Sequence, residues 1–187
     1  MTNVLQRTNA ADLEIRSDGR TIAGIAMPFG QAAQNVEGAR RYVETFVRGA
    51  FARAISERGA ERVKLLVQHD HTSLPIGRAT LLREDAAGLY GEFRVSETQL
   101  GDEVLALVRD GALDALSVGF RPVLAGDRWN ADRTRVERTE VKLPEVSVVP
   151  FPAYDGARII GVRSDGSPLI STAAARRRLD LIERTWS

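Results

Sequence analysis

The stretch Val63-Lys64-Leu65-Leu66-Val67-Gln68-His69-Asp70-His71 is a short apolar run that ends in the only two histidines of the sequence. A run rich in Val and Leu is typical of a β-strand. Alternation along a strand places His69 on the same face as Leu65 and Val67, and His71 joins that face if the strand continues. Any chemistry that needs an imidazole must therefore use one of these two side chains.

Length and composition indicate an ordinary globular protein. The 187 residues fit one domain with tails, or at most two small domains. The hydrophobic content of 43% is enough for a core, and the net charge of +1 gives no reason to expect nucleic acid or a membrane surface as partner. There is no cysteine, which removes disulfides, thiolate nucleophiles and thiolate metal sites.

The first residues, Met1 to Asp18, are polar and lack the apolar core of a signal peptide. No apolar run approaches the ~18 residues needed to span a bilayer. We therefore expect a soluble, intracellular protein.

Hydrophobic periodicity predicts mainly strands, with two helices. Strands are expected at 13–15, 21–26, 42–46, 63–71, 79–82, 89–95, 115–123, 135–149 and 159–162. Helices are expected at 49–59 and from a cap at Ser96 or Thr98 to about Arg109, with Leu100, Val104, Leu107 and Val108 on one face. Residues 1–12 are expected to be frayed, and 28–38 and 125–133 to be loops. Pro144 is expected to interrupt the strand at 135–149 or to cause a bulge in it.

Most of the predicted connections are too short for parallel crossovers. The fold class is therefore α+β or mainly β, an antiparallel β-rich domain with two helices. We find no internal repeat. The C-terminal segment, 164–187, is polar at first and then carries Arg176-Arg177-Arg178. A solvated tail is favoured there, and a marginal basic helix at 173–187 is the alternative.

Ser117 is a candidate nucleophile for hydrolysis. An attacking serine needs a base, which here must be His69 or His71, and the base needs a third group that holds its tautomer. Alternation places Ser117, Gly119 and Arg121 on one face of their strand. The glycine, without a side chain, would leave open backbone for a substrate. The competing interpretation is an ordinary half-exposed strand serine.

Glu145 opens the apolar segment Glu145-Val146-Ser147-Val148-Val149. A carboxylate at the start of such a segment is expected to be partly buried, and a buried carboxylate needs a partner such as a histidine. A strand-end glutamate that faces water is the alternative. Ser147 shares a face with Glu145 and is a competing nucleophile.

Other chemistries have weaker support. His69 and His71 together could chelate zinc, but a third ligand would have to come from elsewhere. The phosphate-binding patterns G-x-x-x-x-G-K-[ST] and G-x-G-x-x-G do not occur. A nucleic-acid site would rest on three tail arginines without interleaved aromatic residues.

A series of motifs resembles the prohead (procapsid maturation) proteases of tailed phages, which are related in fold to the herpesvirus assemblin proteases. The motifs run in order over about residues 13–162. They are Gly24-Ile25-Ala26-Met27-Pro28-Phe29, Arg48-Gly49-Ala50-Phe51, Leu66-Val67-Gln68-His69-Asp70, Leu74-Pro75-Ile76-Gly77-Arg78, Gly88-Leu89-Tyr90-Gly91-Glu92-Phe93, Ala115-Leu116-Ser117-Val118-Gly119-Phe120 and Glu145-Val146-Ser147-Val148-Val149-Pro150-Phe151-Pro152-Ala153.

The resemblance implies a serine endopeptidase with an antiparallel β-barrel flanked by a few helices, similar to the herpesvirus protease. Ser117 matches the nucleophile, His69 the base and Glu145 the third member. His71 is a secondary candidate, because the herpesvirus relatives use a second histidine as the third member. Arg121 is a secondary candidate for stabilising the oxyanion, and Arg78 a further guess. No metal or organic cofactor is called for.

The resemblance also implies substrates and a place of action. The substrates would be the phage major capsid protein or the scaffold protein, and the enzyme itself, inside the immature prohead in the host cytoplasm. It implies a protease domain at 13–163, a flexible tail at 1–12 and a tail at 164–187 that self-cleavage would remove. A homo-oligomer is compatible with it, whereas nucleic acid and membrane are not expected as partners. The alternative function is a non-enzymatic capsid-assembly or scaffold protein with the same fold.

Overall fold

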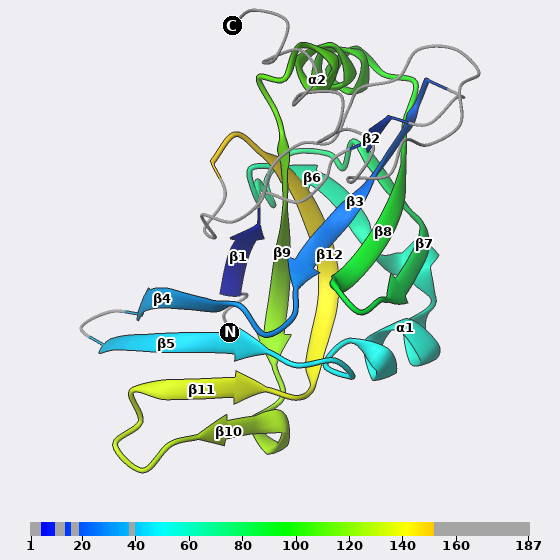
Figure 1. The fold of residues 1–187 in the computed structure, drawn as a ribbon. Coiled ribbons are helices and arrows are strands. Elements are labelled where there is room, and N and C mark those ends of the chain that lie inside the picture. The colour runs from blue at the N-terminus through cyan, green and yellow to red at the C-terminus, as the bar shows by residue number, and fades with distance from the viewer. Residues whose placement is uncertain (1–4, 10–13, 16–18, 38–39, 152–187) are drawn as a thin grey trace, which may run out of the picture.

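The computed structural model describes residues 5–9, 14–15, 19–37 and 40–151 (Figure 1). Their backbone forms a large curled sheet, a smaller sheet that extends from one end of it, and two α-helices. In this part of the chain no helix has the length and apolarity that crossing a membrane requires.

The large sheet has eight strands in the order β1-β9-β12-β6-β7-β8-β3-β2. Its strands are β1 (Leu5–Asn9), β2 (Glu14–Ile15), β3 (Thr21–Pro28), β6 (Lys64–Val67), β7 (Gly77–Glu84), β8 (Gly88–Val95), β9 (Ala115–Pro122) and β12 (Val141–Val149). The sheet curls until β3 lies near β1 and β9, so that it forms an incomplete barrel. Every pairing in it is antiparallel except β12 with β6.

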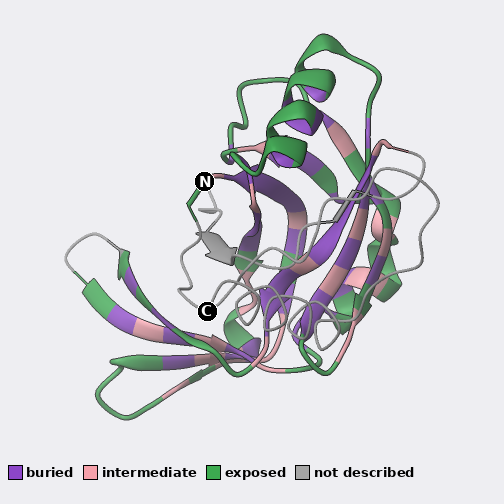
Figure 2. Cartoon of the chain, turned by 45° about the horizontal axis from the view of Figure 1, so that its top comes forward, coloured by how far each residue is buried: buried purple, intermediate pink, exposed green. Residues whose placement is uncertain are grey.

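Apolar side chains fill the inside of the curled sheet, where Figure 2 shows the buried residues. Phe93, Phe120 and Leu65 are completely buried there. Burying one such side chain contributes about 1.5–3 kcal/mol. Phe46 and Phe51 extend this core toward the smaller sheet, since Phe46 contacts the ring of Phe120 with centroids 5.0 Å apart. These side chains belong to one large core, and Ala115 and Val149 form a separate small cluster.

The small sheet has the strand order β10-β11-β5-β4. Its strands are β4 (Ala32–Glu37), β5 (Arg40–Phe46), β10 (Asp127–Trp129) and β11 (Arg135–Arg138), and β11 runs parallel to β5. The buried Arg138 guanidinium lies 2.7 Å from the Glu44 carboxylate and also pairs with Asp127. Because buried charges need partners, this cluster ties β5, β10 and β11 together.

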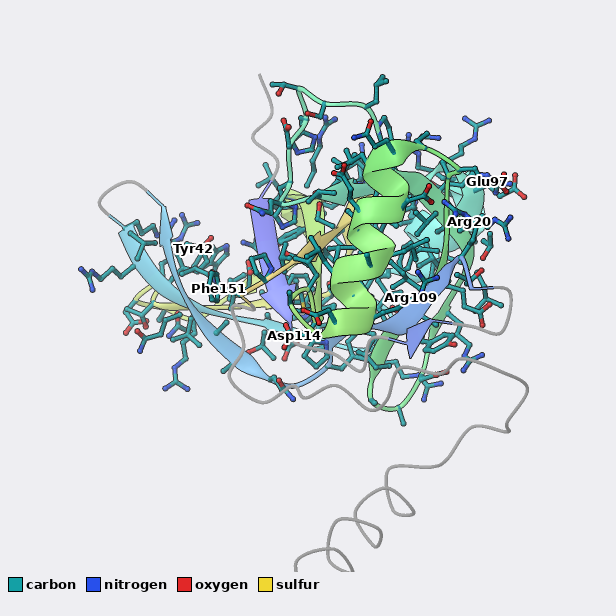
Figure 3. All side chains as sticks on the ribbon, turned by 90° about the horizontal axis from the view of Figure 1, so that it is seen from above. Arg20, Tyr42, Glu97, Arg109, Asp114 and Phe151 are labelled. Carbon is teal, nitrogen blue, oxygen red and sulfur yellow. The ribbon has the colours of Figure 1, made fainter. Side chains whose placement is uncertain are left out.

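Helix α1 (Ala52–Arg58) packs against β7 and β12, and α2 (Gln99–Asp110) connects β8 to β9. The Thr98 side chain caps α2 by accepting a hydrogen bond from the Gly101 amide, and Gly111 ends it in a left-handed conformation. Arg20 pairs with Asp102 at 2.7 Å, and Arg109 donates to the Gly19 carbonyl, so both join α2 to the start of β3 (Figure 3). The two short 3₁₀ turns are Ala60–Arg62 and Leu124–Gly126.

The predicted mainly β fold is confirmed, and so are the strands near 13–15 and 21–26, which pair as β2 and β3, both helices and the irregularity at Pro144. Other expectations were wrong. Leu5–Asn9 form β1 rather than a frayed tail, because they pair with the otherwise open edge of β9. Ala32–Glu37 and Asp127–Trp129 are strands rather than loops, because each pairs with a neighbour in the small sheet.

Two further details differ from expectation, and two predictions are not tested. Two strand pairs are parallel, because strands that are distant in sequence meet there. The buried face of α2 is formed by Val104, Leu105 and Val108, while Leu100 and Leu107 are 42% and 45% exposed. The predicted strand at 159–162 and the tail at 164–187 lie outside the described residues.

Candidate active site

The position of His69 is set by a tight turn rather than by a strand. β6 ends at Val67, four residues before the predicted end of the strand at 71, and both Gln68 (φ 50°) and His69 (φ 57°) have positive φ. The Asp70 amide closes the turn by donating to the Val67 carbonyl at 2.9 Å. Positive φ at both central residues is the pattern of a type I′ turn. The turn leaves the His69 side chain buried, with 9% exposure.

Asp70 stabilises the segment that follows. Its carboxylate accepts hydrogen bonds from the Ser73 hydroxyl and from both the hydroxyl and the amide of Thr72. These bonds, with Ser73 contributing most, hold the pKa of Asp70 well below its usual range. The charged carboxylate therefore fixes the backbone on the C-terminal side of His69.

Strands β9 and β12 supply the other two predicted side chains. Their antiparallel register places Ser117 opposite Ser147, and Gly119 opposite Glu145. Directly opposite residues in a sheet share a face, so these four positions form a small square on one side of the two strands. The register shifts between Lys142 and Glu145, at the predicted Pro144 bulge. The bulge thus sets which residue of β12 lies opposite Gly119.

The structure brings Ser117, His69 and Glu145 into one chain of hydrogen bonds. The Nε2 atom of His69 lies 2.5 Å from the Ser117 Oγ, and the Nδ1 atom lies 2.7 Å from Oε1 of Glu145. An ionised carboxylate only accepts hydrogen bonds, so Nδ1 carries the proton and Nε2 presents its lone pair to the hydroxyl. Ser117 and Glu145 are 0% and 2% exposed. Such an arrangement can move a proton from serine to imidazole.

Two further residues complete this arrangement. The Ser147 Oγ donates to Oε2 of Glu145 at 2.9 Å and accepts from the His69 amide at 3.0 Å. The carboxylate of Glu145 fills the space above Gly119, where the sequence had suggested open backbone for a substrate. The alternation predicts that Glu145 and Ser147 share a face. It does not distinguish a hydroxyl that supports the carboxylate from one that acts as the nucleophile.

The secondary candidates lie outside the hydrogen-bonded group of Ser117, His69 and Glu145. His71 is exposed and lies two residues beyond His69, in the bend that follows the turn. Arg121 is exposed near the end of β9, opposite Lys142, and its role as an oxyanion donor stays a prediction. Among the described residues, no three His, Cys, Asp or Glu side chains are grouped so that they could hold a metal ion. Both ring nitrogens of His69 already bond to protein groups.

Comparison with known proteins decides the family. Residues 7–169 match the family described as Caudovirus prohead serine protease. The chain belongs to this family. It is similar to the prohead protease of Enterobacteria phage HK97, with 26% identity over 166 residues that cover 88% of this chain and 71% of the relative. The resemblance that the motifs carried is thereby confirmed.

The fold is also that of a known phage protease. The structure of the bacteriophage T4 capsid assembly protease matches with a TM-score of 0.53 and 15% identity, and the match covers 79% of this chain and 97% of that one. At this identity the likeness shows the fold. It confirms the curled, mainly β architecture for this member of the prohead serine proteases.

Proposed function

We propose that this chain is a serine endopeptidase of prohead maturation, in which Ser117 is the nucleophile, His69 the general base and Glu145 the residue that orients the base. The observation that carries the proposal is the unbroken hydrogen-bonded chain Ser117–His69–Glu145 in a member of a prohead serine protease family. Serine, imidazole and carboxylate in this order make up the catalytic arrangement of many serine hydrolases.

The reaction follows from the positions of the protons. The Ser117 Oγ forms a bond to the peptide carbonyl carbon while its proton moves to Nε2 of His69, 2.5 Å away. The carbonyl electron pair moves onto oxygen, and Glu145 stabilises the imidazolium that results. When the C–N bond breaks, the imidazolium gives its proton to the leaving amine. Water, activated by the same base, then releases the acyl group from Ser117.

The burial of the hydrogen-bonded residues Ser117 and His69 supports the proposal that the enzyme is regulated. Ser117 is fully buried and His69 is 9% exposed in this conformation. A peptide can reach Oγ only when the site opens, which fits a protease that must stay inactive until the shell has assembled around it. Low activity of the free protein is therefore consistent with the proposal.

The relatives suggest the substrates. One is named a prohead protease and the other a capsid assembly protease. By likeness, this chain cleaves the scaffold protein or a scaffolding segment of the major capsid protein, and also itself, inside the immature prohead in the host cell. The tail at 164–187 is the segment that we expect self-cleavage to remove.

Co-expression with the cognate capsid and scaffold proteins tests the proposal. Wild type should shorten at least one of them, and Ser117→Ala should leave all of them intact. Wild type and Ser117→Ala should give the same circular dichroism spectrum.

Ser56→Ala is the matched control, because that hydroxyl is exposed on α1 and should be dispensable. Cleavage by Ser117→Ala at the wild-type rate would rule out the proposed nucleophile. Capture of shell protein by wild type without any cleavage would favour the scaffold alternative.

A further inference from the structure

The hydroxyl of Ser147 occupies a position that the proposed reaction does not itself require. Ser147 lies directly opposite Ser117 in the pairing of β12 with β9, and its side chain is completely buried. It was a candidate nucleophile in the sequence, yet the acceptor of its proton is Oε2 of Glu145. The imidazole nitrogen Nε2 lies instead against Ser117. Ser147 therefore needs another explanation.

The two hydrogen bonds of Ser147 join it to His69 and Glu145, which are also hydrogen-bonded to each other. Its Oγ accepts the His69 amide proton at 3.0 Å and donates its own proton to Glu145 at 2.9 Å. The His69 ring returns to the other oxygen of that carboxylate at 2.7 Å. The three bonds close a ring through the backbone of His69, the hydroxyl of Ser147 and the carboxylate of Glu145.

This ring constrains two degrees of freedom that the proton transfer depends on. The bond to Oε2 stops the carboxylate from rotating, so that Oε1 stays in line with Nδ1. The bond to the amide holds His69 in a left-handed conformation (φ 57°), which residues with a β-carbon adopt reluctantly. A buried serine hydroxyl that only needed a hydrogen-bond partner could bond to any nearby carbonyl. The hydroxyl of Ser147 instead connects the proposed base to the residue that orients it.

We propose that Ser147 is a positioning residue that fixes the rotamer of Glu145 and the backbone of His69, and so keeps Nε2 aimed at Ser117. This inference rests on the proposed function. Ser147 acts through its two neighbours and touches neither the substrate nor the reacting atoms. A loss of alignment of about 1 Å at a reacting group can cost roughly 10²-fold in rate.

Kinetics of Ser147 variants provide the first test, on a peptide that spans the cleavage site mapped in the co-expression experiment. Ser147→Ala should lower kcat roughly 10- to 100-fold and leave KM within about twofold, because only the alignment of the base changes. Ser147→Thr, which keeps the hydroxyl, should restore most of kcat. Ser147→Cys keeps a slightly larger side chain with only a weak donor in this space, so it should also lower kcat. It keeps the test decisive if the truncation in Ser147→Ala impairs folding.

The matched control is Val146→Ala. Val146 is equally buried on the same strand, but it packs in the apolar core. Its truncation should lower the melting temperature without changing kcat. An equal loss of kcat in Val146→Ala would show that Ser147 acts through general packing, which would overturn the proposal.

A proton NMR measurement separates this proposal from the proposed function. The Nδ1 proton between His69 and Glu145 should resonate far downfield, and a His71→Gln background leaves His69 as the only imidazole in the chain. Ser147→Ala and Ser147→Cys should lose or shift this resonance, whereas Val146→Ala should keep it. Wild-type kcat together with the wild-type resonance in Ser147→Ala would overturn the positioning role. Undiminished cleavage by Ser117→Ala would instead overturn the proposed function, whatever the resonance shows.

Discussion

Gly119 and Glu145 are opposite residues of β9 and β12, and a β-carbon on Gly119 would lie 1.6 Å from Oε1 of Glu145. The three atoms that such a β-carbon would meet first all belong to the Glu145 side chain beyond its β-carbon. Gly119→Ala should therefore push the carboxylate off Nδ1 of His69. We expect kcat to fall roughly 10²-fold or more, with an overpacking cost of about 1–3 kcal/mol in unfolding free energy. Peptide kinetics and urea unfolding measure the two effects.

A double-mutant cycle isolates the cause. In a Glu145→Ala background the three clashing atoms are gone, so Gly119→Ala should cost little further stability or activity. If Gly119→Ala is as harmful there as in wild type, the glycine serves some purpose other than making room for the carboxylate.

The turn at Gln68 and His69 predicts an unusual response to glycine. Gln68 is exposed and has φ 50°, a conformation that costs a residue with a β-carbon about 1–2 kcal/mol. Gln68→Gly should remove that cost, and since glycine loses roughly 0.5–1 kcal/mol of its own, we expect a gain of up to about 1 kcal/mol with activity retained. Gln34→Gly, at an exposed position of β4 without positive φ, should instead destabilise the protein. Equal losses from both changes, measured by urea unfolding, would contradict this account of the turn.

The small sheet depends on the buried charge of Arg138. Arg138→Met keeps much of the side-chain volume but removes the guanidinium that pairs with Glu44 and Asp127. Removing one partner of a buried ion pair costs about 3–5 kcal/mol. Arg128→Ala breaks only an exposed pair with Glu137 at 3.2 Å and should cost less than about 1 kcal/mol. Thermal unfolding of the two variants should therefore differ clearly, and similar melting temperatures would argue against a structural role for the cluster.

Asp70 predicts a pH-dependent contribution to stability. The hydrogen bonds from Ser73 and Thr72 lower the pKa of its carboxyl in the folded protein. The stabilisation is therefore present above the unfolded pKa of ~3.9 and is lost as the pH falls through the lower folded value. The melting temperature of wild type should exceed that of Asp70→Asn by a constant amount from about pH 7 to about pH 5, and the gap should narrow below about pH 4. A gap that stays constant down to about pH 3 would show that the charge is not responsible.

Much of the fold could be predicted from local pattern, whereas the roles of the candidate site residues came from the resemblance to a known family. Alternation identified most strands of the large sheet, and a cap at Ser96 or Thr98 marked the start of α2, where the structure has Thr98. The motif order named Ser117, His69 and Glu145, which lie far apart in the sequence. Distance in sequence is no obstacle here, because the resemblance matches each of the three residues through its own motif.

The strands that the sequence did not predict are those whose formation depends on pairing with another strand in the folded protein. β4 and β10 have polar sequences with no clear period, and β1 adds to an edge that only exists once β9 has folded. The strand that was expected to carry His69 ends early because two residues without glycine's freedom adopt positive φ, for which the sequence offers no signal. The part played by Gly119 depends on the register of β9 with β12, and therefore on the bulge at Pro144.

Active-site labelling with a serine-directed phosphonate, followed by peptide mapping, tests the central claim most directly. The geometry of Ser117, His69 and Glu145 predicts a single adduct on Ser117, absent from Ser117→Ala and formed much more slowly in His69→Ala, with His71→Ala labelled as fast as wild type. Because Ser117 is fully buried in this conformation, we expect labelling to be faster in assembling proheads than in the free protein. An adduct on Ser147, or unchanged labelling of Ser117 in His69→Ala, would contradict the proposed site.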